Sequence, residues 1–413
     1  MFDVIGKHIN TLALYVHIPF CATKCGYCDF NTYSGIEKLI GSYTCALIKE
    51  VQLWGAKLSQ PQLSSIFFGG GTPSYLDSVH TLKIIESISS AFQIPKDIEI
   101  TLEANPEDIR IDKLHEYQNA GINRISIGVQ SLENNLLKLL GRRHDANTAI
   151  QAVRKTIEVG FNNVSIDLMY GLPNQTLKDW RHTLDESSSL GLPHLSIYCL
   201  GLEEGTPMSQ SVKSGELPKP DPDLAAEMYE LTIEQLGNLQ YRHYEISNWA
   251  QTGFESKHNI NYWENQPFLG LGPGAHSYLP NMRFSNIKSP REYIYRLANT
   301  TLDLKSSSKK GVKDTVPTID NLENLSTRTE ILDTLMMGLR LDTGISEAKY
   351  FTRFGRSLDE QWESTIKSAV DDGLMRWNSD NAIKQDNRQL QLTKKGKLFS
   401  NEVLSRFFAA STK

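Results

Sequence analysis

Short apolar runs rich in β-branched residues alternate with longer helical patterns over the first 200 residues of the chain. The predicted strands cover residues 12–18, 65–69, 98–104, 124–129, 163–170 and 194–200. The stretches between them, such as 132–158 and 176–190, are long enough for helices. Continuous apolar strands separated by helices are typical of parallel βαβ units in which both faces of the sheet are covered.

Three of these units share a sequence pattern, which indicates an internal repeat. In "AGINRISIG", "VGFNNVSID" and "LGLPHLSIY" a glycine precedes an apolar-Ser-Ile strand core at a constant distance. We therefore expect Gly121, Gly160 and Gly191 to end helices in the left-handed conformation. The repeat favours a barrel or partial barrel of the α/β class, with an open doubly wound sheet as the alternative, and six such units fit before residue 202. In both folds the functional side chains gather at the carboxyl ends of the strands.

The pattern changes after residue 202. Residues 203–223 are rich in Gly, Pro and charge and are predicted to form a loop, and the polar stretch 302–326 is predicted to be a linker. From residue 328, three short helices followed by a hairpin resemble a winged helix, and their acidic residues favour a packing or partner module over DNA binding. The predicted organisation is a barrel domain at 1–225, an associated α+β segment at 226–326 and a winged-helix-like domain at 327–413.

Composition and charge exclude several classes of protein. Hydrophobic residues make up 39% of the 413 residues and charged residues 22%, as in ordinary globular proteins. A net charge of -5 is mild and gives no reason to expect a nucleic-acid partner. No apolar run approaches the roughly 20 residues of a membrane helix, and the N-terminal residues lack the features of a signal peptide. We therefore expect a cytoplasmic protein that does not span a membrane.

Three of the five cysteines lie within eight positions in "HIPFCATKCGYCDF", directly after the first predicted strand. In the cytoplasm, cysteine clusters such as Cys21, Cys25 and Cys28 more often bind metal than form disulfides. A structural zinc site would need a fourth protein ligand, and neither Cys45 nor Cys199 has matching spacing. Three thiolates on a [4Fe–4S] cluster would leave one iron free to bind a small chelating molecule.

The Cys-x3-Cys-x2-Cys spacing after a first barrel strand resembles the radical S-adenosylmethionine (SAM) superfamily. This resemblance implies a partial (β/α)6 barrel and a [4Fe–4S] cluster held by Cys21, Cys25 and Cys28. It also implies that SAM binds the fourth iron through its amino and carboxylate groups. Reductive cleavage of SAM would then yield methionine and a 5′-deoxyadenosyl radical.

Longer motifs indicate one family within this superfamily. "YVHIPFC", "GGGTP", "GVQS" and "DLMYGLP" resemble the family of oxygen-independent coproporphyrinogen III oxidases and related heme chaperones, over residues 12 to about 278. The glycine run lets a ligand approach the backbone closely and presents N–H groups to it. Each of the next three predicted strands carries a polar residue at or near its end. Burying such residues without partners in a dry core would cost free energy. By position, the resemblance implies SAM contacts from Tyr15, Gly70, Gly71, Thr72, Glu103, Gln130, Arg142 and Asp167.

Two departures separate the oxidases from the chaperones. The oxidase pattern has a further cysteine two residues after the third, and this position is Phe30 here. The oxidases also carry an N-terminal extension that helps to close the active site, whereas only 14 residues precede Tyr15. Both departures make this chain resemble the heme chaperones.

The stretch "HNINYW" at 258–263 resembles the HNxxYW heme-binding motif of the chaperones. The resemblance implies heme contacts from His258, Tyr262 and Trp263, because histidine is a common axial ligand and the rings offer flat surfaces. From the residues alone, the alternative is an aromatic loop that covers the open barrel, with His258 hydrogen-bonded. His276, in "GLGPGAHSY", is a further candidate near the same barrel mouth.

The expected function is that of a heme chaperone. It would bind heme, a [4Fe–4S] cluster and SAM, and transfer heme to an acceptor, for which a respiratory heme protein is one possibility. The sequence does not decide whether the protein forms a dimer, and it identifies no catalytic residue. The alternatives are an oxygen-independent coproporphyrinogen III oxidase, which would remove carbon dioxide from propionates, and another radical SAM reaction on a small molecule.

Overall fold

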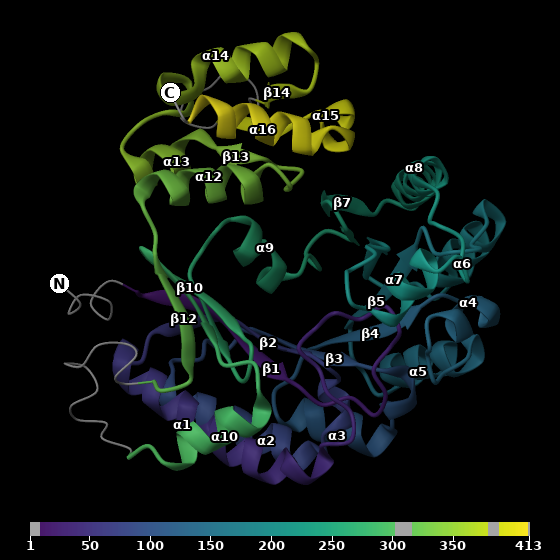
Figure 1. The fold of residues 1–413 in the computed structure, drawn as a ribbon, viewed down its shortest axis with the longest axis vertical. Coiled ribbons are helices and arrows are strands. Elements are labelled where there is room, and N and C mark those ends of the chain that lie inside the picture. The colour runs from purple at the N-terminus through teal and green to yellow at the C-terminus, as the bar shows by residue number, and fades with distance from the viewer. Residues whose placement is uncertain (1–8, 302–315, 379–387, 412–413) are drawn as a thin grey trace.

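A mostly parallel sheet of 12 strands dominates the computed structural model, which describes residues 9–301, 316–378 and 388–411 (Figure 1). Its central strands are parallel neighbours in chain order and match the predicted strands to within a few residues. They are β1 (Thr11–Ile18), β2 (Gln62–Gly70), β3 (Glu99–Ala104), β4 (Arg124–Gln130), β5 (Asn163–Tyr170) and β6 (His194–Cys199).

Helices between these strands cover the outer face of the curved sheet (Figure 1). They are α1 (Ile40–Leu58), α2 (Ser78–Ala91), α3 (Ile111–Asn119), α4 (Asn134–Leu139), α5 (Ala146–Glu158) and α6 (Leu177–Ser189), with short 3-10 turns at Glu37–Leu39, Pro73–Tyr75 and Pro106–Asp108. Fully buried Trp54 and Trp180 anchor α1 and α6 in the core. The φ angles of Gly121, Gly160 and Gly191 are 91°, 102° and 66°, which confirms the predicted left-handed helix ends.

Shorter strands extend the sheet on both sides without closing it. Beyond β1 lie β9 (Phe268–Leu271), β10 (His276–Leu279), β11 (Met282–Asn286) and β12 (Ile319–Asn324), and beyond β6 lie β8 (Asn248–Ala250) and β7 (Arg242–Glu245). Strand β9 is parallel to β1, and the other added strands are antiparallel to their neighbours. Because β12 and β7 stand at opposite ends of the strand order and do not pair with each other, the fold is the predicted partial barrel and not a closed one.

Two loop predictions are wrong in part. Residues 203–223 include helix α7 (Pro207–Lys213), which begins where the Thr206 side chain accepts a hydrogen bond from the backbone N–H of Ser209, and the start of α8 (Pro222–Asn238). In the predicted linker 302–326, residues 302–315 lie outside the described residues, but 319–324 form β12. In the described part of the barrel two further helices follow, α9 (Lys257–Trp263) and α10 (Pro290–Ala298).

The C-terminal residues form the predicted winged-helix-like unit with its own core. It contains α12 (Thr327–Gly338), β13 (Ile345–Ser346), α13 (Glu347–Phe354), α14 (Leu358–Asp371), β14 (Met375–Asn378), β15 (Gln389–Leu392), α15 (Lys394–Leu398) and α16 (Ser400–Ala410). Buried Leu335, Trp362 and Phe407 belong to this core. The unit contacts the C-terminal end of α9 through the ion pair of Lys349 with Glu264, the residue that follows this helix, at 2.7 Å. Within the described ranges, no helix is long and apolar enough to cross a membrane.

Candidate functional site

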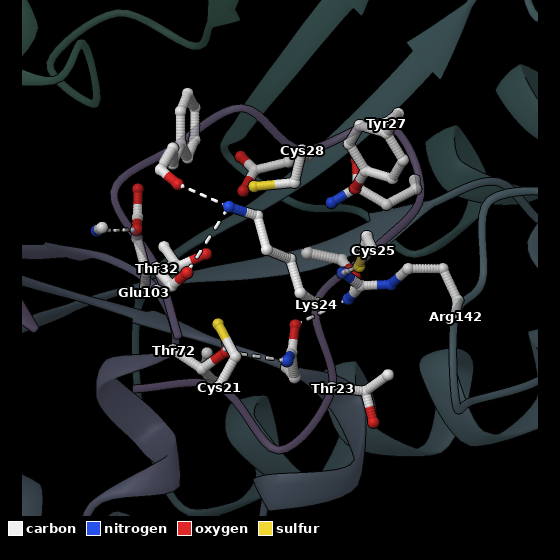
Figure 2. A pocket seen from close by; sticks show the side chains of 18 of the residues that line it. Cys21, Thr23, Lys24, Cys25, Tyr27, Cys28, Thr32, Thr72, Glu103 and Arg142 are labelled. Carbon is white, nitrogen blue, oxygen red and sulfur yellow. Dashed lines mark hydrogen bonds between the residues drawn. The ribbon is translucent and has the colours of Figure 1, made fainter. Parts of the chain in front are cut away.

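A cavity of about 720 Å³ opens at the carboxyl ends of strands β2 to β5, under the loop that follows β1 (Figure 2). We call it the thiol cavity, because Cys21, Cys25 and Cys28 all line it. Of the residues expected at the SAM site, it is also lined by Gly70, Gly71, Thr72, Glu103, Gln130, Arg142 and Asp167. Tyr15, the remaining expected contact, lines two adjoining cavities instead.

The three thiols are spread around this cavity (Figure 2). The hydroxyl of Thr72 donates to Sγ of Cys21 at 3.5 Å, and Nη1 of Arg142 donates to Sγ of Cys25 at 3.7 Å. Burial raises the pKa of both the Cys21 and the Cys28 thiol. Among the described residues, no three Cys, His, Asp or Glu side chains form a preassembled metal site. The cysteine loop must therefore tighten around any metal that the three thiols hold in common.

The glycine run after β2 packs closely against the start of the cysteine loop. A Cβ atom on Gly71 would lie 2.7 Å from the carbonyl oxygen of Phe20 and 2.8 Å from that of Ile18. The backbone N–H groups of Gly71 and Thr72 already donate to these same two carbonyls, and that of Gly70 donates to Glu103. In this structure these three N–H groups are thus engaged within the protein, and the expected contact of the run with a ligand stays a prediction.

Two half-buried carboxyl groups, Glu103 and Asp167, project from β3 and β5 into the cavity. Burial, together with the nearby charge of Asp167, raises the pKa of Glu103 to about 8. Burial also raises the pKa of Asp167, although the Ser126 hydroxyl donates to its Oδ1 at 3.0 Å. Buried Arg124 opposes both shifts by favouring the carboxylates. Such a pair suits cationic groups or hydroxyl groups of a ligand.

Arg142 reaches the cavity from the loop between α4 and α5. Its Nη2 donates to Oδ1 of Asn105 at 2.6 Å and to the carbonyl of Gly128 at 2.7 Å. Asn105 in turn donates to the Thr72 hydroxyl at 3.1 Å, and so links the glycine run to Arg142. Sequence reasoning missed Asn105, Ser126 and Arg124. Asn105 follows a strand end in "LEANP", and Arg124 and Ser126 lie in the strand "RISIG". These positions were the signal that the sequence offered.

His258 lies in α9, which covers the inner, concave side of the barrel. The residue is 1% exposed, its Nδ1 lies 2.8 Å from the Ser65 hydroxyl, and its Nε2 lies 3.0 Å from the Tyr262 hydroxyl. Burial, with the charge of Arg124, lowers the pKa of His258 to about 3. Both ring nitrogens are thus engaged, as in the alternative interpretation of an aromatic cover.

The predicted heme-contact residues face different cavities. His258 and Tyr262 line a cavity of about 1410 Å³ inside the barrel, which we call the lumen cavity. Trp263 instead faces a separate cavity beneath α12, which Tyr262 also lines. Tyr262 also lines a third cavity of about 1400 Å³, between the cysteine loop and β9–β10, which we call the outer cavity. The structure does not bring all three side chains to one of these cavities.

Comparisons with known proteins agree with this architecture. Residues 15–186 match the radical SAM superfamily, and residues 325–399 match the HemN C-terminal domain. The solved structure of coproporphyrinogen III oxidase (HemN) from Escherichia coli, a radical SAM enzyme, superimposes with a TM-score of 0.79 over 96% of this chain and 90% of that one. At 22% sequence identity, this likeness establishes the fold alone.

Similarity in sequence extends over almost the whole chain. The heme chaperone HemW of Bacillus subtilis is 36% identical over 95% of this chain and 98% of the relative. The heme chaperone HemW of Synechocystis is 34% identical, with 98% of each chain covered. The mitochondrial radical S-adenosyl methionine domain-containing protein 1 of Bos taurus is 39% identical over 81% of this chain and 74% of its own. On this near full-length similarity and the two matched domains, this chain belongs to the HemW family of the radical SAM superfamily.

Proposed function

We propose that this protein is a heme chaperone, which binds heme on a radical SAM scaffold and transfers it to an acceptor protein. The observation that carries the proposal is the near full-length similarity to relatives named as heme chaperones. Membership of the radical SAM superfamily implies a [4Fe–4S] cluster and SAM. Heme, the identity of its acceptor and a cytoplasmic location are parts of the proposal.

Cys21, Cys25 and Cys28 would hold the cluster. The donor set fits, because three thiols of one short loop line one cavity, and thiolates are the usual ligands of iron–sulfur clusters. Iron binding would also offset the raised pKa of the Cys21 and Cys28 thiols, since a coordinating thiol is deprotonated. When bound, the cluster supplies an electron to SAM.

SAM would lie along the carboxyl ends of the strands, as the expected residues suggest. Gly70, Gly71 and Thr72 line the thiol cavity, so an extended ligand in this cavity would lie beside the glycine run. Glu103 and Asp167 would accept hydrogen bonds from its ammonium and ribose groups, and Arg142 would balance its carboxylate. Gln130 and Tyr15 complete the set of proposed contacts.

Phe30 favours the chaperone over the oxidase. Its side chain is 63% exposed and lines the thiol, outer and lumen cavities, at the position where the oxidases carry an additional cysteine. A phenyl ring offers no thiol chemistry, but it presents a flat apolar surface at the junction of the three cavities. Such a surface suits binding of a porphyrin.

An anaerobic assay separates the two functions. Cluster-loaded protein, SAM and a reductant are incubated with coproporphyrinogen III while protoporphyrinogen is followed, and the same batch is titrated with heme. Saturable heme binding without turnover supports the chaperone. Turnover would make this protein an oxidase despite Phe30, and neither signal would point to another radical SAM reaction.

A further inference from the structure

The outer cavity has the composition of a site for a flat, dianionic ligand. Its aromatic lining comes from Tyr15, Phe30, Tyr33, Tyr262 and Phe268. The Tyr262 and Phe268 rings meet edge to face, with centroids 4.6 Å apart. Such rings offer the flat apolar faces against which a porphyrin can pack.

We propose that heme binds in the outer cavity with His276 as its axial iron ligand and with Lys24 and Lys288 as partners of its two propionates. This inference rests on the proposed function and deepens it, because it assigns the iron ligand to a residue outside the HNxxYW stretch.

The first argument is the availability of ring nitrogens. The histidines that line the thiol, outer and lumen cavities are His17, His258 and His276. His17 is buried, with Nδ1 3.1 Å from the Tyr15 hydroxyl and Nε2 2.9 Å from the carbonyl oxygen of Asn31. Both nitrogens of His258 are engaged as well. A histidine must release a ring nitrogen before it can ligate iron, so these two are poor ligands as they stand.

His276 differs from both. It is exposed at the start of β10, and no residue in the described part of the chain hydrogen-bonds to its ring. Burial, then the charges of Lys288 and Arg283, lowers the pKa of His276. The imidazole is therefore neutral at physiological pH, which is the form that binds iron.

The second argument is charge. Lys288 is exposed, and no carboxylate of the described residues pairs with it. Among the described residues, Nζ of Lys24 donates to two backbone carbonyls, those of Phe30 at 3.0 Å and Thr32 at 3.4 Å. The acidic residues in the lining are Asp29 and Glu103. Since the pKa of Glu103 is raised to about 8, its carboxyl is mostly protonated at neutral pH, and the cavity carries a net positive charge.

The third argument is the shared wall between the outer cavity and the thiol cavity. Lys24, Phe30, Thr32, Gly70 and Glu103 line both. Cluster binding by the cysteine loop would thus set the shape of the porphyrin site. His258 takes a positioning role in this arrangement, because its Nε2 lies 3.0 Å from the hydroxyl of Tyr262, whose ring lines the outer cavity.

The test is a titration of the full-length, cluster-loaded protein with ferric heme, followed by absorbance and by electron paramagnetic resonance of the heme iron. In His276→Ala we expect at least a tenfold weaker affinity and loss of the histidine-ligated heme signature. Added imidazole should restore that signature. In His258→Ala the signature should persist with altered affinity. His182→Ala, at an exposed position of α6 and not among the residues that line the three cavities, serves as the matched control and should behave as wild type.

The outcomes separate the inference from the proposed function. If wild-type protein shows no saturable heme binding, the proposed function fails. If wild type binds but His276→Ala keeps the same spectrum and affinity, the inference is wrong while the function stands. For the propionates, Lys288→Gln should weaken binding of heme several-fold but leave binding of heme dimethyl ester unchanged. Equal effects on both ligands would contradict the role of Lys288.

Discussion

The backbone N–H of Gly70 donates a hydrogen bond to Oε2 of Glu103 at 3.2 Å, and this bond joins the ends of β2 and β3 at the mouth of the thiol cavity. It favours the carboxylate form of Glu103, but burial and the nearby Asp167 outweigh it and raise the pKa to about 8. Glu103 therefore retains a proton at neutral pH in the ligand-free protein. Two predictions follow from this protonation state.

The stability of the ligand-free protein should depend on Glu103 and pH. The folded pKa of about 8 lies above the ordinary value of 4.5, so the folded protein binds more protons than the unfolded chain between these values. The contribution of Glu103 is fully present below pH 4.5 and is lost as pH rises through about 8. Between these two pH values, the unfolding free energy of wild type should fall with rising pH more steeply than that of Glu103→Gln. We expect the two slopes to differ by about 1.4 kcal/mol per pH unit. Urea unfolding measures this slope.

A control for this slope is Glu86→Gln, at an exposed position of α2, which should leave the decline unchanged. Equal slopes in wild type and Glu103→Gln would mean that Glu103 is ionised at neutral pH.

Binding of SAM should release a proton from Glu103. A cationic ligand favours the carboxylate, so the proton held at pH 7 must leave when the ammonium of SAM binds. Calorimetric titration in buffers with different ionisation enthalpies should show up to one proton released per SAM. Glu103→Gln should release none and bind SAM at least tenfold more weakly. A wild-type binding enthalpy that is independent of the buffer would contradict this coupling.

Each cysteine of the loop should be required for the iron–sulfur cluster. Anaerobic reconstitution of Cys21→Ser, Cys25→Ser or Cys28→Ser should leave the protein without the broad visible absorption of the cluster, because no thiolate can be spared from a three-ligand set. Cys45→Ser, at an exposed position of α1, should reconstitute like wild type. Stoichiometric zinc in place of iron in the wild-type protein would overturn the cluster assignment.

Gly71→Ala should impair the site by crowding the backbone. The new Cβ would lie 2.7 Å from the carbonyl oxygen of Phe20, so the glycine run or the cysteine loop must shift. We expect a loss of about 1–3 kcal/mol in unfolding free energy and weaker SAM binding. In Gly41→Ala the added atom meets nothing within 4 Å on helix α1, so this variant should be as stable as wild type or slightly more stable. Thermal unfolding of both variants, with SAM titrations, tests the contrast.

The barrel strands could be predicted because their information is local. Buried parallel strands such as β4 and β5 are continuous apolar runs, and glycines such as Gly121 mark the helix ends before them. Strand β12, "IDNLEN", escaped prediction since it is mostly exposed and its backbone pairs with β11, a partner that only the tertiary fold supplies. Helix α7 was missed although the Thr206-Pro207 start was visible in the sequence.

For the site, strand-end polar residues were predictable, but their contacts were not. Glu103 and Asp167 follow from the rule that functional residues gather at the carboxyl ends of strands. Whether His258 has a free ring nitrogen depends on Ser65, which lies 193 positions away in the sequence, and on the rotation of α9. Distant contacts of this kind leave no local pattern. The domain boundaries and the heme-binding roles stay predictions.

The most direct test of the chaperone is the kinetics of heme transfer. Heme-loaded protein is mixed with increasing concentrations of heme-depleted respiratory membranes, and separately with an excess of a passive heme scavenger that reports spontaneous release. A chaperone that hands heme over in a complex should transfer it at a rate that rises with acceptor concentration and exceeds the rate of spontaneous release. A transfer rate that never exceeds spontaneous release would show that the protein only binds heme, and would contradict its role as a chaperone.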